Sequence, residues 1–310
     1  MSDILSVLLE KYQLRRTKQQ KDDFFVFVQA AAHSAGYPCE EEAIKGSLFV
    51  SRNLIAGDPE TSKVIFTAHY DTCAWMPFPN LVYPQNRILT ILAQMPLILI
   101  LLALAFGTGY LTYGLWGRIG ATLAAYVVYF GLFSLVFFGP ANKHTANDNT
   151  SGVAALLQIM NALPQEQKQN AAFIFFDNEE YGKVGSKAYA KKHPNITDGK
   201  VLLNLDCVGD GDDFLIIAPQ NAESHLENLL KNAFQDTDGK RAVHCSAPSA
   251  NYNSDQKSFP NATAAAACRK DRFGYHIPRI HTHRDVICEE SNLQYVTACA
   301  VKLTNIVSNE

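Results

Sequence analysis

The sequence predicts a three-layer α/β/α sandwich with a central, mostly parallel (mixed) sheet, into which a transmembrane helical hairpin is inserted. Outside residues 79–140, short apolar runs alternate with segments whose apolar residues recur at helical spacing. This alternation is typical of α/β domains with helices on both faces of the sheet. Residues 79–140 carry charge only at Arg87 and Arg118. We therefore divide the chain into a discontinuous domain, residues 1–78 and 141–310, and a hairpin insertion, residues 79–140.

One or two helices are expected first, because residues 3–35 carry apolar positions at helical spacing around a charged segment. Gly36–Tyr37–Pro38 then ends the helical pattern. Strands are predicted at the apolar runs 46–50, 63–68, 172–176, 201–205, 214–217 and 263–267. Helices after the insertion are predicted at 151–163, in a segment ending at 192, at 224–234 and at 289–307.

The insertion has the composition of a membrane span. No charged residue lies between Arg87 and Arg118 or between Arg118 and Lys143, and each interval holds about 20 predominantly apolar residues, the length that crosses hydrocarbon as a helix. We expect the chain to turn at the glycine-containing residues 107–110. Three aromatic residues near that turn suit a membrane interface: Tyr110, Tyr113 and Trp116. The alternative is a helical hairpin buried in a soluble core, which two consecutive uncharged intervals disfavour.

Composition and topology predict an integral membrane protein with two transmembrane helices and a cytoplasmic domain, since both ends of a hairpin emerge on one side. Seven cysteines, an odd number without paired spacing, argue for a reducing compartment, and the lack of a C-x-x-C pair argues against a cysteine zinc site. The N-terminus lacks the basic and apolar regions of a secretory signal. A net charge of −3 with scattered basic residues argues against nucleic acid as a partner.

Candidate metal ligands lie at the ends of predicted strands. His69 and Asp71 close the strand at 63–68, and side chains two residues apart on a strand point the same way. The other candidates are Asp148, Glu179, Glu180, Asp206, His281, His283 and Asp285. Each motif alone has an ordinary alternative: a structural histidine at His69, a helix cap at Asp148, a solvated turn at the glutamates. Ligands of α/β sheets bind where strands end, so the whole pattern predicts one site.

Together these side chains supply what a two-metal hydrolase needs. Zinc binds imidazole and carboxylate groups, and two zinc ions about 3.5–4 Å apart can share one carboxylate and polarise a substrate carbonyl. A free glutamate then takes a proton from water. The adjacent pair Glu179–Glu180 suits this division, with one carboxylate on a metal ion and its neighbour free.

The motifs occur in a characteristic order. They are His69–Tyr70–Asp71, Asp148–Asn149–Thr150–Ser151–Gly152, Glu179–Glu180–Tyr181–Gly182–Lys183–Val184–Gly185–Ser186, Asp206, and His281–Thr282–His283–Arg284–Asp285. In this order, and over most of the chain outside the hairpin, the sequence resembles the M28 family of di-zinc aminopeptidases. The resemblance implies a zinc-peptidase-like fold and two Zn²⁺ ions per chain.

The resemblance also implies a metal-binding role for five residues. Asp148 bridges the two metal ions. His69 and Asp206 complete one site, and Glu180 and His281 complete the other.

Two catalytic roles are implied as well: Glu179 is the general base, and Asp71 orients the histidine of its motif. Asp285 similarly orients His281. His283 is a rival for the ligand role, and the spacing to Asp285 favours His281.

The sequence departs from the family pattern in two places. Gln256 stands where a Ser-Asp-His-x-x-Phe motif has its histidine, a change that concerns the substrate pocket. The hairpin lies between Asp71 and Asp148, where relatives have a much shorter link. Because both ends of the insertion are tied to residues that converge on the metal ions, we expect the hairpin to rise at the rim of the active site and the pocket to open near the membrane.

The predicted function is a membrane-anchored di-zinc aminopeptidase that hydrolyses N-terminal peptide bonds by metal-activated water, with Glu179 as general base. Its partners are a peptide substrate and the lipid bilayer, and the sequence leaves homo-oligomerisation open. One alternative is a glutaminyl-peptide cyclase, which has the same fold and a single metal ion. The complete set of ligands for two metal ions, including His69 and Asp148, argues against it. The other is a non-enzymatic membrane-bound binding module, which predicts lost ligands, and none is lost.

Overall fold

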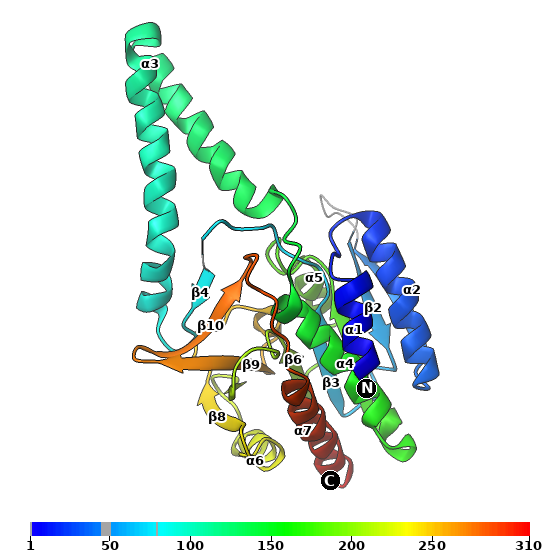
Figure 1. The fold of residues 1–310 in the computed structure, drawn as a ribbon. Coiled ribbons are helices and arrows are strands. Elements are labelled where there is room, and N and C mark those ends of the chain that lie inside the picture. Colours follow the sequence, from blue (N-terminus) through cyan, green and yellow to red (C-terminus); the bar gives the residue numbers. More distant parts are fainter. Residues whose placement is uncertain (1, 45–50, 79) are drawn as a thin grey trace.

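The structure of the protein, a computed structural model, describes residues 2–44, 51–78 and 80–310. In this part of the chain ten strands form one mixed sheet, helices cover both of its faces, and a long helical element projects away from it (Figure 1). The predicted α/β fold with a mixed sheet is confirmed. The strand predicted at 46–50 lies outside the described residues.

The strands are β1 (Cys39–Ile44), β2 (Ser51–Ala56), β3 (Val64–His69), β4 (Asn80–Val82), β5 (Ala171–Phe176), β6 (Val201–Leu205), β7 (Asp213–Ala218), β8 (Arg241–Ser246), β9 (Ala262–Asp271) and β10 (Gly274–Ile280). The α-helices are α1 (Ser2–Lys11), α2 (Lys18–Ser34), α3 (Arg87–Phe138), α4 (Gly152–Ala162), α5 (Val184–Lys192), α6 (Ser224–Ala233) and α7 (Glu290–Ser308). Shorter helical turns are η1 (Ala146–Ser151), η2 (Gln165–Asn170) and η3 (Asp255–Ser258).

The strands lie in the order β1-β2-β5-β3-β6-β9-β10-β4, and β7 also pairs with β9 and carries β8. At the centre, β5, β3, β6 and β9 run parallel. Antiparallel strands flank this group on both sides. Parallel strands end at the same edge of a sheet, so the residues that follow β3, β5 and β6 are brought together there.

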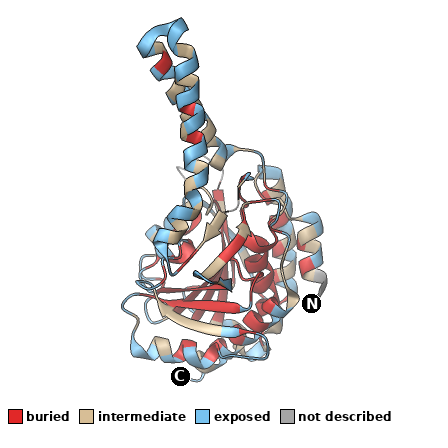
Figure 2. Cartoon of the chain, turned by 60° about the vertical axis from the view of Figure 1, so that its left-hand side comes forward, coloured by how far each residue is buried: buried red, intermediate tan, exposed pale blue. Residues whose placement is uncertain are grey.

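The core explains why β3 and β5 are central. Both strands are buried along their whole length, and their side chains alternate between the two faces of the sheet. Phe66, Phe173 and Phe175 pack with α1, α2, α4, α6 and α7 on one face, whereas Ile65 and Phe176 pack with α5 on the other. Burial on both faces gives such strands continuous apolar runs. Figure 2 shows this buried interior beneath more exposed helices.

Helix α3 occupies the region of the predicted insertion, and it consists of two arms. The helix is broken at Gly117, where φ is 62° and ψ is −173°, and the second arm returns toward the domain (Figure 1). The turn predicted at 107–110 is wrong, since these residues continue the first arm. A glycine inside a helix costs only about 1 kcal/mol, whereas a reversal at positive φ favours glycine strongly. The arms touch near Gly109, where an added Cβ would lie 3.4 Å from the Cβ of Ala125.

Most of α3 is exposed although it is apolar (Figure 2). Its most apolar window is 11% buried, and within the described residues it is the one helix long and apolar enough to cross a membrane. Trp116 lies beside the break and is exposed, as an interfacial aromatic residue would be. These features suggest membrane association.

Candidate metal centre

His69 and Asp71 lie at the carboxyl end of β3. His69 is the last residue of the strand, and its Nδ1 lies 3.5 Å from Oδ1 of Asp71. Both side chains are buried. With Nδ1 turned to this carboxylate, the ring presents Nε2 to the neighbouring strand ends, which is the arrangement of a metal-binding imidazole held by an acid.

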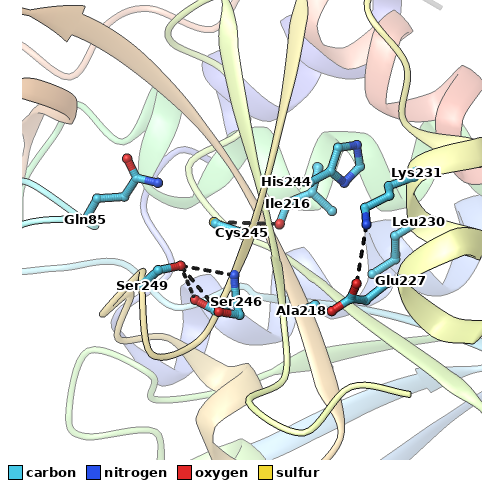
Figure 3. Close-up of a pocket in the computed structure, with 10 residues that line it drawn as sticks. All are labelled: Gln85, Ile216, Ala218, Glu227, Leu230, Lys231, His244, Cys245, Ser246 and Ser249. Carbon is cyan, nitrogen blue, oxygen red and sulfur yellow. Dashed lines mark hydrogen bonds and ion pairs between the residues drawn. The ribbon is translucent and has the colours of Figure 1, made fainter. Parts of the chain in front are cut away.

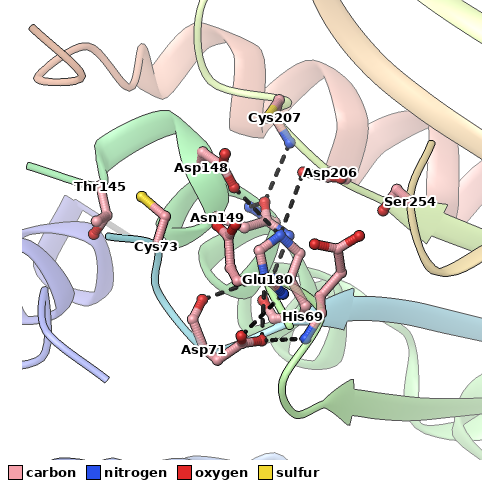
Figure 4. A network of polar contacts seen from close by, with 12 residues as sticks. His69, Asp71, Cys73, Thr145, Asp148, Asn149, Glu180, Asp206, Cys207 and Ser254 are labelled. Carbon is pink, nitrogen blue, oxygen red and sulfur yellow. Dashed lines mark hydrogen bonds and ion pairs between the residues drawn. The ribbon is translucent and has the colours of Figure 1, made fainter. Parts of the chain in front are cut away.

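Asp148 lies between two histidines (Figure 4 shows it beside His69). Its Oδ1 lies 3.3 Å from Nε2 of His69, and its Oδ2 lies 3.1 Å from Nε2 of His281. Each histidine also faces a second acid. Asp206 Oδ1 lies 3.6 Å from His69 Nε2, and Glu180 Oε2 lies 3.3 Å from His281 Nε2. The five predicted metal ligands therefore converge as two groups that share one carboxylate.

Hydrogen bonds fix the backbone around Asp148. The Asn149 amide donates to the last carbonyl of β6, and the Asn147 amide oxygen accepts an N–H from the turn after that strand. The carboxylate of Asp285 accepts the backbone N–H groups of Asn147 at 2.7 Å and Asp148 at 3.0 Å. Asp285 thus holds the backbone of Asp148 in place. The N-cap of α4 is Ser151, so Asp148 is free for another role.

Glu179 and Glu180 lie in the turn after β5. Their backbone N–H groups donate to Oδ1 and Oδ2 of Asp71, at 2.9 and 3.2 Å. One carboxylate therefore positions both the glutamate pair and the histidine of β3. The turn also needs Gly185, because a Cβ at that position would lie 2.5 Å from the carbonyl oxygen of Asp177. This close approach explains the second glycine of the motif.

His281 follows β10 in a left-handed backbone conformation, with φ at 62°. Arg279, two residues earlier, also has a positive φ, and its guanidinium pairs with the buried carboxylate of Asp210. The same carboxylate binds an arginine of β9, which fixes the end of β10. His283 is exposed and lies outside both ligand groups. Of the two histidines in this motif, His281 is therefore the one that faces Asp148.

A cavity of about 370 Å³ opens over these residues and is also lined by Glu179. Two buried carboxylate oxygens, Oε1 of Glu180 and Oδ1 of Asp206, have no hydrogen-bond partner among the residues that the structure describes. Ligand atoms lie within 4.8 Å of one another in two sets, His69 with Asp148 and Asp206, and Cys73 with Glu180 and His281. Unpaired carboxylate oxygens beside imidazole nitrogens are the donors that zinc takes, so these residues fit zinc.

The protonation of the cluster is strongly perturbed. Burial lowers the pKa of His281, but the charges of Glu180 and Asp148 outweigh it and raise that pKa to about 9. Burial also lowers the pKa of His69, and its acidic neighbours raise it well above the usual value. Burial raises the pKa of Glu180 to about 8 and that of Glu179 well above its usual range. Protons on these histidines and glutamates therefore offset the negative charge of the cluster, as a bound cation would.

The sequence model of the family described as Peptidase family M28 matches residues 125–304, more than half of the chain. This chain belongs to peptidase family M28. The match includes Asp148, Glu179, Glu180, Asp206 and His281. The His-x-Asp motif precedes the matched region and reaches the site through β3.

A vacuolar membrane protease of Candida glabrata is a relative of this M28 chain. The two are 32% identical over 94 residues, which are 30% of this chain and 10% of that protein. The aligned segment therefore spans about a tenth of the relative's length.

Three solved structures share the fold of this M28 chain. The Legionella pneumophila LapA aminopeptidase has 14% identity and a TM-score of 0.58, with 100% of this chain and 71% of that chain covered. A Porphyromonas gingivalis glutaminyl cyclase has 18% identity and a TM-score of 0.60, with 99% and 98% covered. A Zn-dependent exopeptidase from Parabacteroides distasonis has 14% identity and a TM-score of 0.57, with 100% and 95% covered.

Gln256 of this M28 chain packs in the interior. Its carbonyl oxygen accepts a hydrogen bond from the Asn204 amide at 3.3 Å, and its own amide donates to the carbonyl of Tyr252 at 2.9 Å. These bonds hold the η3 turn against β6. Gln256 does not line the 370 Å³ cavity, whereas its partner Tyr252 does. The glutamine that stands in place of the family's histidine therefore acts on the cavity indirectly, by supporting its wall.

Cys73 is the site residue that the sequence analysis missed. Its Sγ belongs to the same ligand set as Glu180 and His281, and the side chain is buried. The lack of a C-x-x-C pair argues against a cysteine zinc site. A single cysteine can nevertheless bind a metal ion together with histidine and carboxylate ligands. A signal was present, because residues 69, 71 and 73 are two apart, and in an extended segment such residues face the same way.

A second cavity, of about 410 Å³, lies between β7, β8 and α6 (Figure 3). Several of its polar groups already have partners. Lys231 Nζ pairs with Glu227 at 3.3 Å, Ser249 Oγ donates to the Ser246 carbonyl at 2.8 Å, and His244 Nε2 contacts a backbone carbonyl at 3.0 Å. Although larger, this cavity holds neither of the two ligand sets, whose histidines and carboxylates line the smaller one.

Proposed function

We propose that this M28 chain is a membrane-anchored di-zinc aminopeptidase that hydrolyses N-terminal peptide bonds. One observation carries the proposal: the two oxygens of Asp148 face two different histidines, each of which has its own second acid. A carboxylate shared in this way suits two adjacent metal ions better than one. His69 and Asp206 would hold one zinc ion, and Glu180 and His281 the other.

The residues around the zinc positions have distinct tasks. Bound zinc supplies Lewis acidity, which polarises a carbonyl group and lowers the pKa of water. Glu179 lines the cavity and makes no ion pair with a described residue, whereas Glu180 faces His281. Glu179 therefore takes the proton from the attacking water and later delivers it to the leaving amine. Asp71 acts as a positioning residue, since it holds the backbone of Glu179 and the ring of His69.

The same fold is compatible with two other functions. A glutaminyl-peptide cyclase is the second candidate, because the likeness to the Porphyromonas gingivalis glutaminyl cyclase extends over nearly the whole of both chains. A non-enzymatic binding module is disfavoured, since both ligand sets keep their donors. Both sets of metal ligands are complete, whereas an enzyme with a single metal ion needs only one set. This favours peptide hydrolysis over cyclisation.

The proposed location is a membrane that α3 crosses twice, with the catalytic domain in the cytoplasm. The length and apolar surface of α3 support the membrane location, as does the relative named as a vacuolar membrane protease. The seven cysteines are free, which suits a reducing compartment.

The decisive experiment combines metal analysis with a substrate panel. The purified full chain is expected to hold two zinc ions and to release N-terminal residues from aminoacyl peptides. Peptides that begin with glutamine separate the two enzymes, because a cyclase converts them without releasing an amino acid. Glu179→Gln should keep its zinc and lose about 10²–10⁴-fold in kcat, while the exposed control Glu166→Gln should not change. Full activity of Glu179→Gln would refute the mechanism.

A further inference from the structure

The hairpin α3 forms one wall of the catalytic cavity. Thr90 and Gln94 from its first arm and Phe137 from its second arm line the cavity of about 370 Å³, together with Glu179 and His281. Both arms contribute, and they do so close to the domain rather than near the break at the far end (Figure 1). The hairpin is therefore part of the pocket as well as an appendage of the domain.

Arg16 ties the second arm to the catalytic turn. Its guanidinium donates to the carbonyl oxygens of Phe137 at 2.9 Å and Gly139 at 2.8 Å, and to the hydroxyl of Tyr181 at 2.8 Å. Tyr181 directly follows the glutamate pair, and its ring stacks on Phe138 with 5.7 Å between centroids. One arginine thus fixes the end of the hairpin against the turn that carries the proposed general base.

The first arm is fixed at the opposite side of the pocket. The backbone N–H of Tyr83 donates to Oγ1 of Thr90 at 2.9 Å. Just before it, β4 pairs with β10, the strand that leads to His281. The loop from β3 is bonded there too, through the N–H of Met76 and the carbonyl of His281 at 2.7 Å. Both arms of α3 are therefore bonded to segments that adjoin the cavity, and these bonds fix the wall that the arms form.

The surface of the hairpin becomes apolar within one helical turn of the cavity. Leu97 lies about 5 Å beyond Gln94 along the helix axis. It lines an apolar cavity of about 240 Å³ between the two arms and residues 75–78. Exposed apolar side chains continue outward from there, among them Leu99, Phe106, Leu111 and Leu115. An exposed apolar surface of this extent suits hydrocarbon, which would then begin within a few ångströms of the pocket.

We propose that the substrates are membrane-anchored peptides in which an apolar anchor follows the N-terminus after only a few residues. This inference rests on the proposed aminopeptidase function. An extended peptide advances about 3.3–3.6 Å per residue, so about two residues connect the pocket at Gln94 to the apolar surface at Leu97. A pocket remote from the bilayer would need a much longer spacer.

The length of the spacer provides the test. The full chain is placed in phosphatidylcholine vesicles with peptides that carry an N-terminal leucine, a glycine–serine spacer of about three or about ten residues, and a palmitoylated lysine. The short-spacer peptide is expected to be cleaved within about threefold of the rate of the long-spacer peptide. Cleavage of the long-spacer peptide alone would overturn the inference.

The same peptides without palmitate distinguish a failure of this inference from a failure of the proposed aminopeptidase function. If they are cleaved and the short-spacer anchored peptide is not, the aminopeptidase function stands and the inference fails. If no peptide is cleaved by the zinc-loaded chain, the proposed function fails and the inference fails with it. Cleavage of the free peptides and of both anchored peptides supports the proposed function and the inference.

A matched pair of variants tests the wall itself. Phe137 lines the cavity, whereas Phe130, on the same arm, makes ring contacts with Tyr126 and Tyr129. Phe137→Ala should raise KM for the short-spacer anchored peptide about tenfold, and Phe130→Ala should leave it unchanged. Zinc content, measured in both variants, shows whether the site still forms. Equal KM values for the two variants, with zinc retained, would overturn the role of the wall.

Discussion

The carboxylate of Asp71 accepts the backbone N–H of Glu179, with 2.9 Å between Oδ1 and the nitrogen. The same Oδ1 lies 3.5 Å from Nδ1 of His69. One buried acid therefore fixes a proposed metal ligand and the turn that carries the proposed base. Its burial alone would raise its pKa, but its contact with His69 outweighs this and lowers the pKa. The ionised form, which accepts all these bonds, is thus the stable one.

Asp71→Asn should weaken both zinc binding and catalysis. The substituted amide cannot accept as many hydrogen bonds, so the ring of His69 and the turn at Glu179 lose their common support. A loss of about 10–100-fold in zinc affinity or kcat/KM is expected, as for other residues that orient metal ligands. Competition with a chelator measures the affinity. The exposed Asp198→Asn serves as the control, and equal behaviour of the two variants would contradict the positioning role.

Zinc binding should release protons at neutral pH. The pKa of His281 is raised to about 9, where the charge of Glu180 outweighs burial, and burial raises the pKa of Glu180 to about 8. The pair therefore holds at least one proton at neutral pH that must leave when a cation binds, so affinity should rise with pH until these pKa values are passed. Calorimetric titrations in two buffers of different ionisation enthalpy measure the release. Identical heats in both buffers would contradict it.

The strands that could be predicted from the sequence are those buried on both faces. β5 and β6 have uninterrupted apolar runs for this reason, and their predicted bounds agree with the structure to within a residue. β1 could not be found in this way, because half of its sequence, Cys39–Ile44, is glutamate and the strand lies at the edge of the sheet. β8 and β10 are only partly buried, and their pairing depends on partners distant in sequence.

The ligands of the candidate site could be predicted because they lie at strand ends with recognisable spacing. The contacts that join this site to the hairpin could not. Arg16 and Phe137 are 121 positions apart, and Arg16 and Tyr181 are 165 apart. No periodicity in the sequence links an arginine between two N-terminal helices to a turn after β5. Cys73 was missed for a different reason, because a cysteine ligand was expected only in a C-x-x-C pair, although its spacing from Asp71 placed the thiol on the side of the site.

Cys73 should contribute a sulfur ligand when cobalt replaces zinc. Its Sγ lies within 4.8 Å of the ligand atoms of Glu180 and His281, and thiolate is a strong ligand for such ions. Cobalt-loaded protein is expected to show sulfur-to-cobalt charge-transfer absorption in the near ultraviolet. Cys73→Ser should abolish this band and keep the weaker visible bands of bound cobalt, while Cys39→Ser, at the sheet edge, should keep both. A wild-type spectrum without the band would contradict ligation by sulfur.

Lys21 should stabilise the domain through the turn that precedes Glu179 and Glu180. Its Nζ lies 2.5 Å from Oδ1 of Asp177 and 2.7 Å from the side-chain oxygen of Asn178, and neither partner of the ion pair is appreciably exposed. Lys21→Met leaves the Asp177 carboxylate buried without its cation, which typically costs about 3–5 kcal/mol. Thermal and denaturant unfolding of the full chain should show a large loss. The double variant Lys21→Met with Asp177→Asn should recover part of that stability, because it removes the unpaired charge. Equal stability of Lys21→Met and the wild type would show that the pair does not hold α2 to this turn.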